Sequence, residues 1–165
     1  MAERARLICV MGVAGCGKTT VGEALAEALG AEFLEADRLH PATNIARMSA
    51  GTPLTDDDRW PWLDAVGAAA PRAGRAVIAC SALRRVYRER LASGAGEPIF
   101  FVHLTGPKAE IASRMGLREG HFMPTTLLDS QFATLEPPER DEPHMTLDIR
   151  LPLIRMIDIA SKELT

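Results

Sequence analysis

The chain has little of what marks secreted or membrane-bound proteins. Only three of its 165 residues are cysteine, and their spacing fits neither a zinc site nor a disulfide framework, so we expect reduced thiols. No apolar run approaches the roughly 20 residues of a membrane span. The opening MAERAR leads into an apolar segment without a signal-peptide pattern. These absences argue against a membrane partner and make the cytoplasm the expected location.

The chain also lacks an excess of basic residues. It carries 19 Lys and Arg against 22 Asp and Glu, which gives a net charge of −3 and a pI of about 5.8. Proteins that bind nucleic acid generally show the opposite imbalance. Internal repeats, low-complexity segments and domain linkers are also missing. We therefore expect a single domain over residues 1–165 that acts on a small molecule and binds no nucleic acid.

The most informative stretch that is present is GVAGCGKT, from Gly12 to Thr19. It fits the phosphate-binding pattern of Gly, any four residues, Gly, Lys and Thr, and it lies between a strand-like apolar run and a helical pattern. Glycine adopts positive φ without a Cβ penalty, so the backbone can curl with its N–H groups around phosphate oxygens. Lys18 would then reach the β- and γ-phosphates of ATP, and the Thr19 hydroxyl would bind Mg²⁺. The residues predicted to bind the nucleotide here are Gly12, Val13, Ala14, Gly15, Cys16, Gly17, Lys18, Thr19 and Thr20.

Strand and helix patterns alternate along the whole chain. Apolar runs predict strands near residues 7–11, 31–37, 75–80, 97–104 and 144–149, and helical periodicity follows each of them. Such alternation is typical of an α/β fold in which helices cover both faces of a parallel sheet through right-handed crossovers. The expected architecture is three layers, αβα, around a five-stranded parallel sheet.

Two local features of the helices are also predicted. One helix is expected to open at residues 56–58, where one of three aspartates would cap it, and Pro61 is tolerable only within its first turn. A later helix near residues 82–92 presents a charged face of the kind that is usually solvated. That face consists of Arg84, Arg85, Arg88 and Arg90.

Two carboxylates, Glu35 and Asp37, stand at the end of the second predicted strand. The carboxyl ends of parallel strands form the edge where open α/β sheets bind ligands, so we expect Asp37 at the same edge as Lys18. There Asp37 would accept the proton of an attacking hydroxyl, or hold that hydroxyl in line with the γ-phosphate. The alternative is an aspartate that only caps a helix or stabilises a turn.

Four motifs, in order, resemble those of the gluconokinases, a family in the shikimate-kinase-like group of P-loop kinases. They are GVAGCGKTT, DRLHPATNIARMSAGTPLTDDDRWPWL, CSALRRVYRERL and REGHFMPTTLLDSQFATLEPP, and they extend from Leu7 to about Pro138. The first is common to P-loop kinases, whereas the other three are specific to this family. The resemblance implies ATP-dependent phosphorylation of D-gluconate to 6-phospho-D-gluconate. It also implies a small lid near residues 119–126 and acceptor-covering helices near 41–70, and it allows a homodimer, because relatives are often dimers.

The resemblance adds further residues around the nucleotide. Relatives commonly place Asp-Gly-Asp at the end of the second strand, and here Glu35 takes the first position, from which its longer side chain would reach Mg²⁺ through water. Arg118, in the lid, would stabilise charge on the transferring phosphoryl group and is the third catalytic candidate beside Lys18 and Asp37. Arg114, on the same helical face, would pack on the adenine, the alternative being an ion pair with Glu110.

Five more residues are expected to bind the acceptor, besides Asp37. They are His40, Arg59, Ser81, Arg84 and His121. The guanidinium fork of Arg59 suits the carboxylate of gluconate, the alternative being a surface arginine paired with Asp56 or Asp58. His40 is equally consistent with a turn residue ahead of a proline, and His121 with a solvated side chain.

Two rival interpretations stay open at this point. One is another small-molecule kinase, for shikimate or a nucleoside monophosphate. Shikimate kinases typically carry three glycines after the third strand, where this chain has CSAL, and a monophosphate would need more arginines in the pocket. The other rival is a nucleotide-dependent switch without catalysis, which would have no use for Asp37 or for arginines in a lid.

Overall fold

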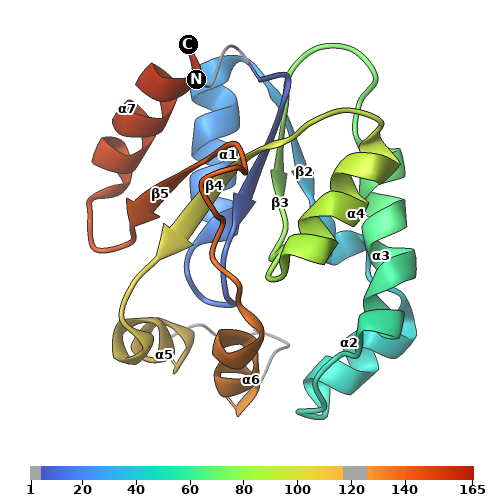
Figure 1. Cartoon of the computed structure of the whole chain (residues 1–165). Helices are drawn as coiled ribbons and strands as arrows, with labels where there is room; N and C mark the ends of the chain where they lie inside the picture. The colour runs from blue at the N-terminus through green and yellow to red at the C-terminus, as the bar shows by residue number, and fades with distance from the viewer. Residues whose placement is uncertain (1–4, 117–125) are drawn as a thin grey trace.

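The computed structural model describes residues 5–116 and 126–165. Within these residues the centre is a five-stranded, parallel sheet with strand order β2-β3-β1-β4-β5 (Figure 1). The predicted five-stranded parallel sheet is thus confirmed. The strands are β1 (Leu7–Met11), β2 (Glu32–Glu35), β3 (Ala76–Ala79), β4 (Phe100–Thr105) and β5 (His144–Asp148).

β1 lies in the middle of the sheet and is buried along its whole length. Val10 pairs with Ala79 of β3 on one side and with Val102 of β4 on the other. All five β1 residues are 0% exposed, and a strand covered on both faces is expected to be a continuous apolar run such as LICVM. Because the strands are parallel, the loops that follow β1, β2 and β3 leave the sheet at one edge.

Helices cover both faces of the sheet (Figure 1). α1 (Lys18–Leu29) and α7 (Leu153–Leu164) pack together on one face, and α3 (Asp56–Ala69) and α4 (Arg85–Ala95) pack together on the other. This arrangement confirms the predicted three-layer αβα fold. None of the described helices is long and apolar enough to cross a membrane. The remaining described helices are a 3₁₀ helix (Ala36–Leu39), α2 (Ala42–Ser49), α5 (Lys108–Gly116) and α6 (Thr126–Thr134).

The start of α3 differs from the prediction. Its cap is Thr55 rather than an aspartate, because the Thr55 side chain accepts a hydrogen bond from the Asp58 N–H over 3.2 Å. The Asp58 carboxylate in turn accepts from the Thr55 N–H over 2.9 Å. This reciprocal capping box satisfies two N–H groups and fixes the start of the helix at Asp56. Pro61 then lies beyond the first turn, so its predicted position is wrong.

α4 begins later than predicted, at Arg85. The chain leaves β3 through a turn in which Ala82 has a φ of +46°, a left-handed conformation that is uncommon for a residue with a Cβ. On α4 itself Arg88 is only 2% exposed. The prediction of a solvated arginine face is therefore wrong for Arg88, because the connection between α6 and β5 covers this side of the helix.

Candidate active site

The loop between β1 and α1 has the curled backbone that its glycines predict. Gly12, Gly15 and Gly17 have φ values of +150°, +79° and +96°, where a Cβ is strained. A Cβ on Gly12 would also lie 2.8 Å from the Leu104 carbonyl oxygen. At Gly15 it would lie 2.3 Å from Met115 Cγ. The fold thus requires glycine at Gly12 and Gly15 for two reasons, backbone conformation and close packing.

Lys18 and Thr19 begin α1 and turn toward different neighbours. Lys18 Nζ donates a hydrogen bond to the Val13 carbonyl over 3.0 Å, so the ammonium group folds back onto the loop. Thr19 Oγ1 donates to Glu35 Oε2 over 2.6 Å and so connects the loop with the end of β2. The cation and the hydroxyl that the motif assigns to phosphate and Mg²⁺ are therefore both at the carboxyl edge of the sheet.

Glu35 is half-buried beside Thr19. Burial raises the pKa of its carboxyl group, and the hydrogen bond from Thr19 opposes that shift. Hydroxyl and carboxylate oxygens suit Mg²⁺, which commonly takes only one or two protein ligands and completes its shell with water and phosphate oxygens. No group of three or more His, Cys, Asp or Glu placed to hold a metal occurs in the described part of the chain. The Thr19–Glu35 pair therefore fits an ion that binds together with a nucleotide.

Asp37 lies just after β2, in the 3₁₀ helix, on the same edge of the sheet as Lys18. Its side chain is 45% exposed, and its Oδ1 lies 3.9 Å from His40 Nε2. The chain between Glu35 and Asp37 is short, so the Thr19–Glu35 hydrogen bond also brings Asp37 near the phosphate loop. An accessible carboxylate beside a phosphate-binding loop is a recurring arrangement in enzymes that transfer a phosphoryl group to a hydroxyl.

His40 is packed into the structure rather than exposed in a turn. Its ring stacks on Trp62, with centroids 4.0 Å apart, and Asn44 Nδ2 lies 3.3 Å from its Nδ1. Burial lowers the pKa of His40 to about 4, the charge of Asp37 opposes the shift, and that of Arg59 adds to it. His40 is therefore neutral at pH 7, with one ring nitrogen toward α2 and the other toward Asp37.

Arg59 and Arg84, from the start of α3 and the turn before α4, meet around Tyr87. The guanidinium carbons lie 5.0 and 5.6 Å from the centroid of the Tyr87 ring. Arg59 Nη1 donates to the Tyr87 hydroxyl over 3.0 Å and to the Leu54 carbonyl over 2.7 Å, which replaces the expected alternative of a pair with a neighbouring aspartate. Two guanidinium groups thus lie on one aromatic side chain.

Asp56 is the anion of this group. The Tyr87 hydroxyl donates to Asp56 Oδ1, and Arg84 Nη1 donates to Asp56 Oδ2 over 2.6 Å. The hydrogen bond from Tyr87 is the main cause that lowers the pKa of Asp56, and the charge of Arg84 adds to it. Arg84 also reaches Glu136 over 3.2 Å. The Asp56 carboxylate is therefore already held beside Arg59 and Arg84, the two arginines predicted to bind an acidic acceptor.

Ser81 belongs to a turn whose three successive carbonyl groups are each bound by a different element. The Ser81 carbonyl accepts from the Gly12 N–H over 3.2 Å, which ties the turn to the phosphate loop. The Ala82 carbonyl accepts from Arg88 Nη1 over 2.8 Å, and the Leu83 carbonyl accepts from the Glu136 N–H over 2.7 Å. These bonds hold the turn, including the left-handed Ala82, in one shape.

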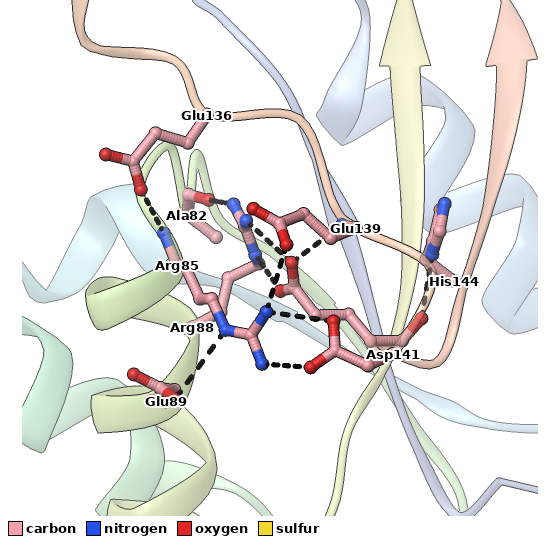
Figure 2. Close-up of polar contacts among 9 residues, drawn as sticks. Ala82, Arg85, Arg88, Glu89, Glu136, Glu139, Asp141 and His144 are labelled. Carbon is pink, nitrogen blue, oxygen red and sulfur yellow. Dashed lines mark hydrogen bonds and ion pairs between the residues drawn. The ribbon is translucent and has the colours of Figure 1, made fainter.

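Arg88 is the buried anchor of this turn (Figure 2). Its guanidinium group forms a fork with Glu142, with Nε 2.6 Å from Oε1 and Nη2 3.2 Å from Oε2. Figure 2 shows the connection that carries Glu136 and Asp141 running against α4, and Arg85 pairs with Asp141 on its exposed side. The connection thus serves to bury one arginine of α4 and to pair another.

Arg114, on α5, contacts the end of β5. Its Nη2 donates to the Ile149 carbonyl over 3.0 Å, and its Nε lies 3.2 Å from Glu110 Oε1. The alternative pair with Glu110 is therefore present, and the predicted packing on adenine stays a prediction. Arg118 and His121, predicted for the lid, lie outside the described residues.

The structure also brings two residues to the site that the sequence reasoning missed, Tyr87 and Gln131. Gln131, on α6, accepts a hydrogen bond from the Ala14 N–H of the phosphate loop over 2.7 Å. An amide side chain within the DSQFATLE segment was the available signal for Gln131. For Tyr87, the single tyrosine of the chain, the signal was its place in the arginine-rich segment after β3.

Known proteins resemble the chain in sequence and in fold. A family model described as an AAA domain matches residues 7–138. A gluconokinase from Gluconobacter oxydans is 51% identical over 147 residues, and the match covers 87% of this chain and 82% of that protein. The thermoresistant gluconokinase of Escherichia coli is 44% identical over 149 residues, with 87% and 85% covered. The crystal structure of a gluconokinase from Sinorhizobium meliloti matches with a TM-score of 0.88 at 46% identity, covering 98% of this chain and 93% of that one. The chain belongs to the gluconokinase family of P-loop kinases.

Proposed function

We propose that this protein transfers the γ-phosphoryl group of ATP to the terminal hydroxyl of D-gluconate, which gives 6-phospho-D-gluconate and ADP. The observation that carries the proposal is the Thr19–Glu35 hydrogen bond, because it joins the phosphate loop to the end of β2 immediately before Asp37. A nucleotide on the loop and an acceptor beside Asp37 would then be neighbours. The choice of gluconate rests on the relatives that carry the name gluconokinase. The rival acceptors, shikimate and nucleoside monophosphates, find no such support.

The nucleotide side of the reaction is mainly electrostatic. Lys18 and the loop N–H groups neutralise the triphosphate, and Arg118 of the predicted lid adds charge to the transferring phosphoryl group. Thr19 would hold Mg²⁺ directly and Glu35 would hold it through water, and the ion would supply positive charge to the triphosphate. Arg114, which donates to the Ile149 carbonyl, would pack on the adenine base.

On the acceptor side, Asp37 positions the hydroxyl and takes its proton. The hydroxyl oxygen forms the new bond to the γ-phosphorus while the bond to the β–γ bridging oxygen breaks. Neutral His40, whose ring stacks on Trp62, restricts the positions open to the Asp37 side chain and to the acceptor. Ser81 and Arg84 bind acceptor hydroxyls from the turn after β3. Arg59 binds the gluconate carboxylate, as its guanidinium fork suits a planar anion.

An assay of ADP release with gluconate, shikimate and AMP, run side by side, tests the proposal. We expect acceptor-dependent turnover with gluconate only. Lys18→Ala should fold normally and lose turnover, which makes it the inactive control. Turnover with shikimate or AMP alone would overturn the acceptor, and nucleotide binding without turnover on any of the three would overturn the kinase. Near-normal turnover by Lys18→Ala would refute the role of Lys18.

A further inference from the structure

One peptide group of the phosphate loop, between Val13 and Ala14, is hydrogen-bonded at both of its ends. Its carbonyl oxygen accepts from Lys18 Nζ over 3.0 Å. Its N–H donates to Gln131 Oε1 over 2.7 Å. The ammonium of Lys18 and the amide of Gln131 therefore lie on opposite ends of the same rigid plane, and the orientation of that plane determines both contacts.

Gln131 is well placed to hold this plane because its helix is fixed to the body of the protein. Leu127 and Leu128 of α6 are 3% and 2% exposed, and Leu128 belongs to the main hydrophobic core. Just beyond the helix, the Glu136 N–H binds the Leu83 carbonyl over 2.7 Å. The acceptor oxygen of Gln131 is thus presented by an element that is anchored on both sides of it.

Within the loop, this plane receives one long hydrogen bond, from the Cys16 N–H to the Val13 carbonyl over 3.4 Å. Glycines stand on both sides of it, Gly12 and Gly15, and glycine permits backbone rotations that other residues resist. If the plane turned over, the Val13 carbonyl would point away from Lys18. Two hydrogen bonds through one peptide group also polarise each other, so the contact at the N–H end strengthens the contact at the carbonyl end.

We propose that Gln131 is a positioning residue for Lys18: by accepting the Ala14 N–H it fixes the peptide whose carbonyl holds the Lys18 ammonium over the phosphate loop. An ammonium group has three donors, so one bond to Val13 is compatible with bonds to phosphate oxygens. The inference rests on the proposed phosphoryl transfer, because that reaction is the reason why Lys18 must be held at the triphosphate. Gln131 acts through the loop, not on the acceptor.

A double-mutant cycle in nucleotide affinity tests the proposal. The affinity for a non-hydrolysable ATP analogue with Mg²⁺ is measured by titration calorimetry on the full chain and on Gln131→Met, Lys18→Met and the double variant. We expect Gln131→Met, which keeps the side-chain volume, to weaken binding about fivefold to tenfold. In the Lys18→Met background the same change should cost less than about twofold, because coupled residues are not additive.

Two controls keep the outcome clear. Gln131→Ala should reproduce the loss seen with Gln131→Met, and Asp129→Asn, an exposed change on the same helix that affects only a surface pair with Lys108, should leave affinity unchanged. Wild-type affinity in Gln131→Met, or an equal loss in both Lys18 backgrounds, would overturn the proposal. The measurement needs no acceptor, so a wrong choice of gluconate would not disturb it.

Discussion

Thr19 Oγ1 donates a hydrogen bond to Glu35 Oε2 over 2.6 Å. The two residues come from the starts of different connections, one after β1 and one after β2, and β3 lies between these strands in the sheet. Their contact therefore bridges a strand at the carboxyl edge and brings the nucleotide-binding loop to the segment that carries Asp37. It also puts the Glu35 carboxylate in direct contact with the predicted Mg²⁺ ligand, Thr19.

Glu35→Gln should raise the Mg²⁺ requirement. The amide keeps the size of the side chain and can still accept from Thr19, but it carries no charge for a metal-bound water. We expect the Mg²⁺ concentration for half-maximal turnover to rise about tenfold, with little change in the KM for gluconate. Glu35→Asp should stay closer to wild type, because it keeps the charge. A Mg²⁺ titration at fixed ATP measures both, and an unchanged profile for Glu35→Gln would remove Glu35 from the metal site.

Arg59→Lys should weaken the binding of the acceptor and leave that of ATP alone. Lysine keeps the charge but loses the planar fork, and it cannot bind a carboxylate and the Tyr87 hydroxyl in the same way. We expect the KM for gluconate to rise about tenfold or more while the KM for ATP changes less than about twofold. Arg47→Lys is the matched control, since Arg47 is an exposed arginine 3.9 Å from Asp58. Equal effects on both KM values would argue that Arg59 has only a structural role.

His40 should make the protein less stable as the pH falls. Its folded-state pKa is about 4, below the unfolded value of about 6.5. Between these values the unfolded chain binds the proton and the folded chain does not, so stability falls as pH drops from 6.5 toward 4, by up to about 3 kcal/mol. His40→Phe, which keeps a ring against Trp62, should lose less stability over this range in urea unfolding. Burial also lowers the pKa of His103 to about 4. Because His103 is present in both proteins, its contribution to the pH dependence cancels in the comparison. Parallel stability curves for the two proteins would contradict the assignment to His40.

Features set by neighbouring residues were predictable, and contacts between distant segments were not. The strand before the phosphate loop, the loop's positive φ values and the bounds of α1 follow from local apolar pattern and glycine spacing. The cap of α3 was mispredicted because four consecutive residues, 55–58, can all cap a helix, and only the reciprocal bonds of Thr55 and Asp58 decide among them.

The contacts made by Gln131 and Arg88 show why the rest of the site could not be predicted from the sequence. Gln131 meets Ala14 across 117 residues, and Arg88 meets Glu142 across 54. Each depends on how a connection folds back over a helix or loop, which neither periodicity nor spacing encodes. Arg88 in particular sits in a run of arginines whose pattern is that of a solvated face, and only the covering segment makes it a core residue.

Breaking the Arg88–Glu142 pair should therefore be costly. Arg88→Met leaves the Glu142 carboxylate with the Glu139 N–H but without its charged partner, at a site where the two side chains are 2% and 9% exposed. It also removes the hydrogen bond to the Ala82 carbonyl. We expect a loss of about 3–5 kcal/mol in the free energy of unfolding, measured by denaturant titration. Arg85→Ala, which breaks pairs on the exposed side of α4, should cost less than about 1 kcal/mol.

The double variant Arg88→Met with Glu142→Leu tests whether Arg88 only stabilises the fold or also positions the turn that carries Ser81. An apolar pair should recover most of the lost stability, because no unpaired charge stays buried. It cannot donate to the Ala82 carbonyl, so the turn that carries Ser81 should remain loose, and the KM for gluconate should stay raised while stability returns. If stability and KM recovered together, Arg88 would serve the fold alone. If the KM stayed high in a stable protein, the buried arginine would shape the acceptor site through its hydrogen bond to the Ala82 carbonyl.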